Sequence, residues 1–159
     1  MMDTLPPFYQ PIEGMDVVSW QESPEEIEVV AVSSKKTGRC PHCDSISCKK
    51  HSRYVRSLRD LPVSGKRVTL VLQTNKWFCF QPTCHVKVFT ERLSGISSSK
   101  RYTDRLHLVL QELAFSMSAK AAERCSKAIG APLSHDAFLY LIRAMPESPP
   151  KETPFRRHR

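Results

Sequence analysis

The sequence predicts an α+β fold in which a β-rich domain precedes a small helical domain. In the stretch KRVTLVLQTNKWFCF (66–80), Val68, Leu70 and Leu72 alternate with residues of the opposite face, as in a half-buried strand. After a Gly/Ser-rich linker at 94–100, apolar residues instead recur with the 3.6-residue period of a helix. The 159 residues suffice for one ordinary domain or two small ones.

The β-rich domain is expected over residues 15–95, after a flexible, proline-containing tail at 1–14. Its expected parts, in order, are two short β-type runs within 15–34 (the second at 27–32), a cysteine-bearing turn at 39–48, a basic connection at 49–67, and strands at 66–80 and 86–93.

The helical domain is expected over residues 100–146, followed by a disordered basic tail at 147–159. Thr103 and Ser134 are suitable N-caps for the first and third helices, and Gly130 is a natural stop for the second. The expected buried stripes are Leu106, Val109, Leu110 and Leu113; then Ala121, Ala122, Cys125, Ala128 and Ile129; then Ala137, Phe138, Leu141, Ile142 and Met145.

Four of the six cysteines form two pairs, each at the end of an expected strand. Cys40 and Cys43 are three positions apart, and Cys79 and Cys84 are five, which gives the pattern C-x2-C … C-x4-C. Four thiolates suit one tetrahedral Zn²⁺, and two such loops at hairpin tips are typical of a zinc ribbon. The sequence therefore predicts a zinc-ribbon-like domain that holds one structural zinc ion.

Other interpretations of these cysteines fit less well. A redox C-x-x-C requires a thiolate at a helix N-terminus, a disulfide framework requires an oxidising compartment, and a rubredoxin-like iron site usually has two C-x2-C loops. Several neighbours could replace a ligand but are more simply bystanders: His42, Cys48, His51 and His85. Cys125 falls on an apolar helical stripe and is expected to be a small core residue.

Charge is distributed unevenly along the chain. Residues 1–34 contain seven acids and no Lys or Arg, so residues 35–159 hold all 24 basic residues and carry a net charge of +15. A compact region this positive indicates a polyanionic partner, and double-stranded DNA is the expected one. The N-terminus has neither a secretory signal nor an apolar run of membrane-spanning length, so no membrane partner is expected.

Two short helices joined at residues 130–133 resemble a helix-turn-helix, in which the second helix enters the major groove. A plain three-helix packing unit is the alternative. Basic and polar side chains off the apolar stripes are candidate DNA contacts: Lys120, Arg124, Lys127, Ser134, His135, Tyr140 and Arg143. The connection between the cysteine pairs adds four more: His51, Arg53, Arg56 and Arg59.

Several stretches together resemble a known family. CPHC, HSRYVRSLRDLP, the strand ending in WFC, the C-x4-C loop, VFTERL and LSHDAFLYLIRAMP are similar to the N-terminal zinc-finger and helix-turn-helix region of the ISL-three family of insertion-sequence transposases. The resemblance covers roughly residues 15–146. It implies that Cys40, Cys43, Cys79 and Cys84 are the zinc ligands and that the region recognises terminal inverted repeats in DNA transposition, in a bacterial, nucleoid-associated (cytoplasmic) setting.

In that family a catalytic DDE domain with two divalent metal ions follows this region. The chain ends at Arg159, where that domain is expected to begin, and its acids do not form the carboxylate cluster that two-metal chemistry requires. The expectation is therefore a DNA-binding region without strand-transfer activity, acting as a homodimer or with full-length transposase. The alternative is a small zinc-containing transcription regulator, or a repressor of the intact transposase.

Overall fold

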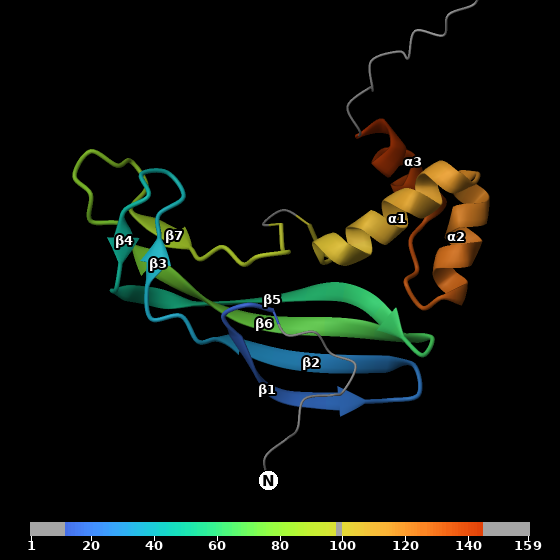
Figure 1. The fold of residues 1–159 in the computed structure, drawn as a ribbon, viewed down its shortest axis with the longest axis horizontal. Coiled ribbons are helices and arrows are strands. Elements are labelled where there is room, and N and C mark those ends of the chain that lie inside the picture. The colour runs from blue at the N-terminus through green and yellow to red at the C-terminus, as the bar shows by residue number, and fades with distance from the viewer. Residues whose placement is uncertain (1–11, 98–99, 145–159) are drawn as a thin grey trace, which may run out of the picture.

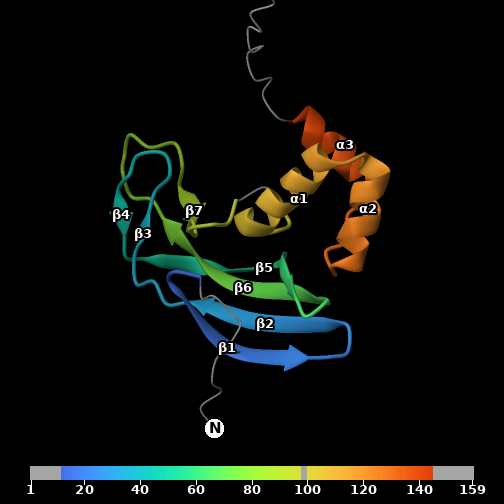
Figure 2. The ribbon, with the colours of Figure 1, turned by 45° about the vertical axis from the view of Figure 1, so that its right-hand side comes forward.

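The computed structural model of the chain describes residues 12–97 and 100–144 and shows an α+β fold (Figure 1). A curled sheet carries the cysteine-bearing loops at one end and three helices at the other, in both views of the ribbon (Figures 1 and 2). The tail expected at 147–159, and all but the last three residues of the tail expected at 1–14, lie outside the described residues.

The main sheet has the strand order β1-β2-β6-β5, and β7 pairs with the far end of β6. Neighbouring strands are antiparallel except β2 and β6, which run parallel. A separate two-stranded sheet, β3-β4, carries the first cysteine pair. The strands are β1 Met15–Glu22, β2 Glu26–Ser33, β3 Gly38–Arg39, β4 Ile46–Ser47, β5 Lys50–Val63, β6 Lys66–Phe78 and β7 Val88–Thr90.

The β5–β6 hairpin is the longest feature of the sheet. The basic connection expected at 49–67 is in fact mostly strand β5, which pairs with β6 from Lys50↔Trp77 to Val63↔Lys66. The sequence does not predict this strand, because residues 50–55 are exposed on both faces and show no alternation of apolar and polar side chains. At the turn, Ser64 and Gly65 both adopt positive φ, the backbone conformation of tight hairpin turns.

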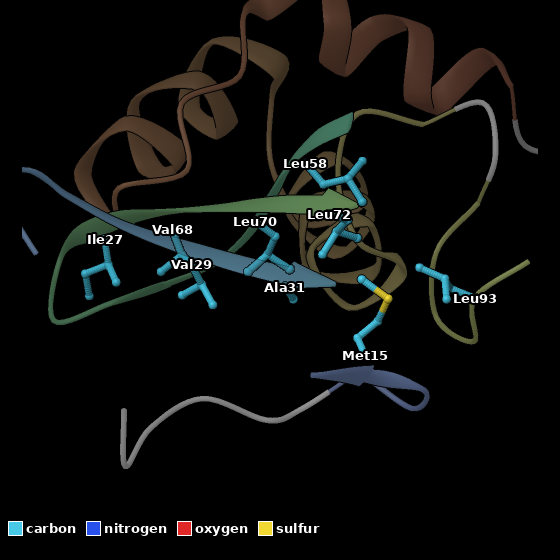
Figure 3. Packing of buried hydrophobic residues seen from close by; sticks show 9 residues of the cluster. All are labelled: Met15, Ile27, Val29, Ala31, Leu58, Val68, Leu70, Leu72 and Leu93. Atoms are coloured by element: carbon cyan, nitrogen blue, oxygen red, sulfur yellow. The ribbon is translucent and has the colours of Figure 1, made fainter. Parts of the chain in front are cut away.

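The concave face of the sheet forms the main apolar core (Figure 3). The alternation expected in β6 is confirmed: Val68, Leu70 and Leu72 are all buried, and Leu58 of β5 joins them. The rest of this core comes from Met15, Ile27, Val29, Ala31 and Leu93.

The three helices are α1 Asp104–Ser116, α2 Ala119–Ala128 and α3 His135–Arg143. The expected caps are confirmed, since the side chains of Thr103 and Ser134 accept hydrogen bonds from the backbone N–H of Leu106 and Ala137. Gly130, at a φ of 87°, follows the C-cap of α2 as the expected stop.

The buried stripes of the first two helices differ from those expected. In α1, Val109 is exposed and Ala114 is buried instead. In α2, Ala128 and Ile129 are exposed and Cys125 is only half-buried, because the inward face runs through Ala119, Ala122 and Ser126. A serine can be buried here because its hydroxyl donates to the Glu123 carbonyl at 2.9 Å and accepts from the Leu133 N–H. In α3, Phe138 and Leu141 are buried as expected, whereas Met145 lies outside the described residues.

The helical unit is fixed to strand β5. Residues around Tyr102 run beside Arg59, with hydrogen bonds from Arg59 N–H to the Arg101 carbonyl and from Thr103 N–H to the Arg59 carbonyl. Asp60, almost fully buried, accepts hydrogen bonds from the Thr103 hydroxyl at 2.7 Å and from Arg105. The Gly/Ser-rich segment therefore leads directly into a hydrogen-bonded junction between sheet and helices.

Candidate metal centre and basic surfaces

Four cysteine sulfurs converge at the end of the β5–β6 hairpin. The Sγ atoms of Cys40, Cys43, Cys79 and Cys84 all lie within 4.8 Å of one another. The separation is 4.0 Å between Cys40 and Cys84 and 3.5 Å between Cys43 and Cys79. Three of the four residues are buried, packed with Trp77 and Phe89.

Two tight loops turn the sulfurs inward. In the first, β3 and β4 form a short hairpin, and hydrogen bonds run from Cys40 N–H to the Ser45 carbonyl and from Asp44 N–H to the Cys40 carbonyl. Asp44, with a φ of 57°, provides the sharp turn. In the second, Cys84 N–H donates to the Gln81 carbonyl at 3.0 Å. Each pair of cysteines is thus held by backbone hydrogen bonds of its own loop.

Ser45 favours ionised sulfurs. Its hydroxyl lies 3.1 Å from Cys43 Sγ and 3.5 Å from Cys79 Sγ. Hydrogen bonds from the Ser45 side chain and backbone lower the pKa of Cys43 to about 6, and the Ser45 side chain is also the main cause of the lowered pKa of Cys79. Burial acts oppositely on Cys84 and raises its pKa to about 12, so this thiol needs a bound cation to ionise near neutral pH.

The cluster fits a zinc ion. Zn–S bonds of about 2.3 Å in a tetrahedron place sulfurs roughly 3.8 Å apart, close to the separations found here. The Sγ of Cys84 lies 3.6 Å from Nδ1 of His42, which makes His42 a neighbour of the four-sulfur group and not a member of it. Cys48 is exposed and outside the group. Four cysteine ligands leave no open position on the metal, so the ion is structural.

Trp77 packs against the cysteines, and Gly38 lies against the Trp77 ring, a contact that the cysteine spacing does not predict. An added Cβ at Gly38 would lie 2.4 Å from Cδ1 of the Trp77 ring, so only glycine allows this close approach. The signal available in the sequence was a glycine two positions before the first cysteine, together with an aromatic residue two positions before the third.

The paired loops, the strand-end positions and the four converging sulfurs define this part of the chain as a zinc ribbon. Residues 36–84 match the family described as the zinc-finger of transposase IS204/IS1001/IS1096/IS1165. Residues 36–84 are thus a zinc ribbon of the ISL-three transposase type.

A curated relative supports this assignment. The chain is 30% identical over 112 residues to the transposase for insertion sequence element IS1001 from Bordetella parapertussis. The match covers 70% of this chain but only 27% of the relative. No solved structure gives a significant match. Among the described helices, none has the length and apolar character needed to cross a membrane.

The candidate DNA contacts fall into two groups. On β5, His51 and Arg53 are exposed near the zinc end. Further along the same strand, Arg56 donates to the carbonyls of Ser97 and Lys100, and Arg59 donates to the Pro132 carbonyl at 2.8 Å. Arg56 and Arg59 therefore contribute positive charge and also brace the segments that lead into and through the helical unit.

The second group lies on the helical unit. Lys120, Arg124 and Lys127 are exposed on α2, where Lys127 pairs with Glu123 at 2.7 Å and thereby lowers the pKa of that carboxyl group. Tyr140 and Arg143 are exposed on α3. Ser134 is used as the helix cap, and Nδ1 of His135 lies 3.3 Å from the Asp136 carboxylate.

Proposed function

We propose that this chain is the zinc-dependent DNA-binding region of an insertion-sequence transposase and that it recognises terminal inverted repeats. The observation that carries the proposal is the zinc ribbon, which matches a transposase zinc finger and is structurally joined to a basic helical unit. The similarity to the IS1001 transposase supports the same context.

Helices α2 and α3 are the proposed helix-turn-helix. The turn between them is short and well held: Ala131 N–H donates to the Ser126 carbonyl, and Leu133 N–H donates to the Ser126 hydroxyl. In this proposal α3 enters the major groove, with Tyr140 (71% exposed) and Arg143 reaching bases or phosphates. The N-terminal residues Ser134 and His135 approach the DNA at the start of α3.

The α2 cations are proposed to bind the phosphate backbone. Lys120, Arg124 and Lys127 have the spacing i, i+4, i+7 and therefore lie along one edge of the helix. Phosphate contacts of this kind fix the orientation of the recognition helix but carry no sequence information. On β5, His51 and Arg53 extend the basic surface toward the zinc ribbon.

Electrophoretic mobility shift and footprinting with the element's own ends test the proposal. Binding to the inverted repeat should exceed binding to a scrambled duplex, and the slope of log K against log salt should reflect several phosphate contacts. Arg124→Ala should reduce binding to both duplexes and lower the slope by about one. Glu112→Ala, on the exposed side of α1, is the matched control. Equal affinity for the repeat and the scrambled duplex would refute inverted-repeat recognition.

A further inference from the structure

An aromatic cluster projects from the zinc end of the hairpin. Phe78 ends β6, Phe80 lies in the second cysteine loop, and His51 lies on β5. The ring centroids of Phe78 and Phe80 are 5.8 Å apart at a tilt of 32°, and His51 contacts the Phe78 ring edge-on at 4.8 Å. The Lys49 Nζ atom lies 5.9 Å and 5.8 Å from the two phenylalanine centroids. These four residues are called the aromatic platform.

The platform is open to solvent. Phe80 is 65% exposed, although it belongs to the loop that carries Cys79 and Cys84. Burying a phenylalanine side chain is worth about 1.5–3 kcal/mol, so a partner that covers the exposed Phe80 ring gains apolar contact energy.

The charged residues around the platform favour a negatively charged partner. Residues 45–90 contain nine Lys and Arg but a single acid, Asp60. Asp60 is buried against Arg105 at the helical junction and does not offset charge near the platform. The platform is therefore an apolar surface on a stretch of the chain in which basic residues greatly outnumber acids.

A nucleic acid whose bases are unpaired combines negative charge with flat apolar faces. In a duplex the base faces are hidden in the stack, so exposed aromatic rings gain nothing from it unless the stack opens. Stacking of single-stranded bases on aromatic side chains, with cations on the phosphates, is the common mode of sequence-tolerant binding.

We propose that the aromatic platform binds unpaired bases of single-stranded DNA. Phe78 and Phe80 supply the stacking surface, while Lys49, beside both rings, faces the phosphates. This second site does not depend on helix-turn-helix recognition of a duplex, because it lies on the zinc ribbon at the other end of the hairpin (Figure 2).

Fluorescence anisotropy with the full zinc-loaded chain tests the proposal. The probes are a fluorescein-labelled thymidine 20-mer and an abasic 20-mer with the same number of phosphates. Wild-type protein should bind the thymidine strand on the order of tenfold more tightly than the abasic strand, the effect expected from about one well-stacked base. Phe80→Ala should abolish this difference. Phe115→Ala, which removes another exposed ring (53%) from α1, should leave this difference intact.

Zinc content and circular dichroism of Phe80→Ala separate a local effect from misfolding, and Lys49→Ala gives a second variant outside the cysteine loop. Equal binding of the two strands by wild-type protein would overturn the proposal. Unchanged discrimination between the two strands by a folded Phe80→Ala variant would also overturn the proposal. A shift in the oligomeric state of that variant would then identify the platform as a protein contact. Duplex binding measured in parallel keeps this outcome distinct from failure of inverted-repeat recognition.

Discussion

The buried carboxylate of Asp60 offers the sharpest test of how the helical unit is attached. Its side chain is 2% exposed and accepts hydrogen bonds from its neighbour's backbone at Leu61, from the Thr103 hydroxyl, and from Nε and Nη2 of Arg105. Asp60→Asn keeps the shape of this side chain but turns an amide nitrogen, a donor, toward donors. We expect the variant to lose the link between β5 and the start of α1.

The size of the effect follows from burial. Removing one member of a buried ion pair typically costs about 3–5 kcal/mol. Because Arg105 is 33% exposed and can recover hydrogen bonds from water, the lower end, about 3 kcal/mol, is expected. A small domain has roughly 5–15 kcal/mol of stability in total, so the loss is easily measured.

Urea unfolding of the zinc-loaded protein, followed by circular dichroism at a helical wavelength, measures this loss. Asp104→Asn is the matched control. Asp104 precedes Arg105 in the first turn of α1, but it is 46% exposed and its ion pair with Lys100 is long, at 4.0 Å. This substitution should therefore change the free energy of unfolding by less than about 1 kcal/mol. If both variants lost the same stability, the buried carboxylate would not be the attachment point. A double-mutant cycle with Arg105→Ala should return a coupling energy of about 2 kcal/mol or more.

Three further perturbations address the zinc ribbon and the helical unit. Chelation of zinc, or Cys84→Ser, should unfold the zinc end of the hairpin and reduce zinc content from about one ion per chain to none, whereas Cys48→Ser should retain the ion, as measured by atomic absorption. Gly38→Ala should destabilise the zinc-loaded protein by about 1–3 kcal/mol, because its Cβ overlaps the buried Trp77 ring; a stability equal to wild type in urea unfolding would contradict this packing. Burial, with a smaller contribution from Lys100, lowers the pKa of His107, so the unfolded state binds its proton first as pH falls. Stability should therefore decline as the pH drops below the unfolded value of about 6.5 and level off below the folded pKa, and His107→Gln should flatten this part of the unfolding profile.

The local signals in the sequence were strong wherever one residue determines the backbone. Thr103, Ser134 and Gly130 mark helix ends, and the structure confirms all three, because capping needs only a short side chain or a positive φ at one position. The spacing of the four cysteines also predicts the metal site correctly, because two short loops at strand ends can bring sulfurs together only within a limited geometry.

Features set by tertiary pairing were missed. Strand β5 has few apolar positions, and its strand conformation comes from the ladder with β6, which no local pattern reveals. The inward face of α2 was misplaced because Ser126, a polar residue, is buried through hydrogen bonds to Leu133 seven positions away. The parallel pairing of β2 with β6 and the contact of Ser45 with the Cys79 sulfur likewise depend on residues distant in sequence.

The β5–β6 hairpin also acts as a spacer of fixed length. The 13 residues of β6 rise about 3.3 Å each, so the metal-bearing end of the hairpin lies roughly 40 Å from its turn, against which Gly130 between α2 and α3 packs. One turn of B-DNA is about 34–36 Å long, so a single duplex that meets both ends must be contacted slightly more than one turn apart. Removing two paired residues from each strand would preserve every inward and outward side-chain direction while shortening the reach by about two base pairs, which a footprint would register directly.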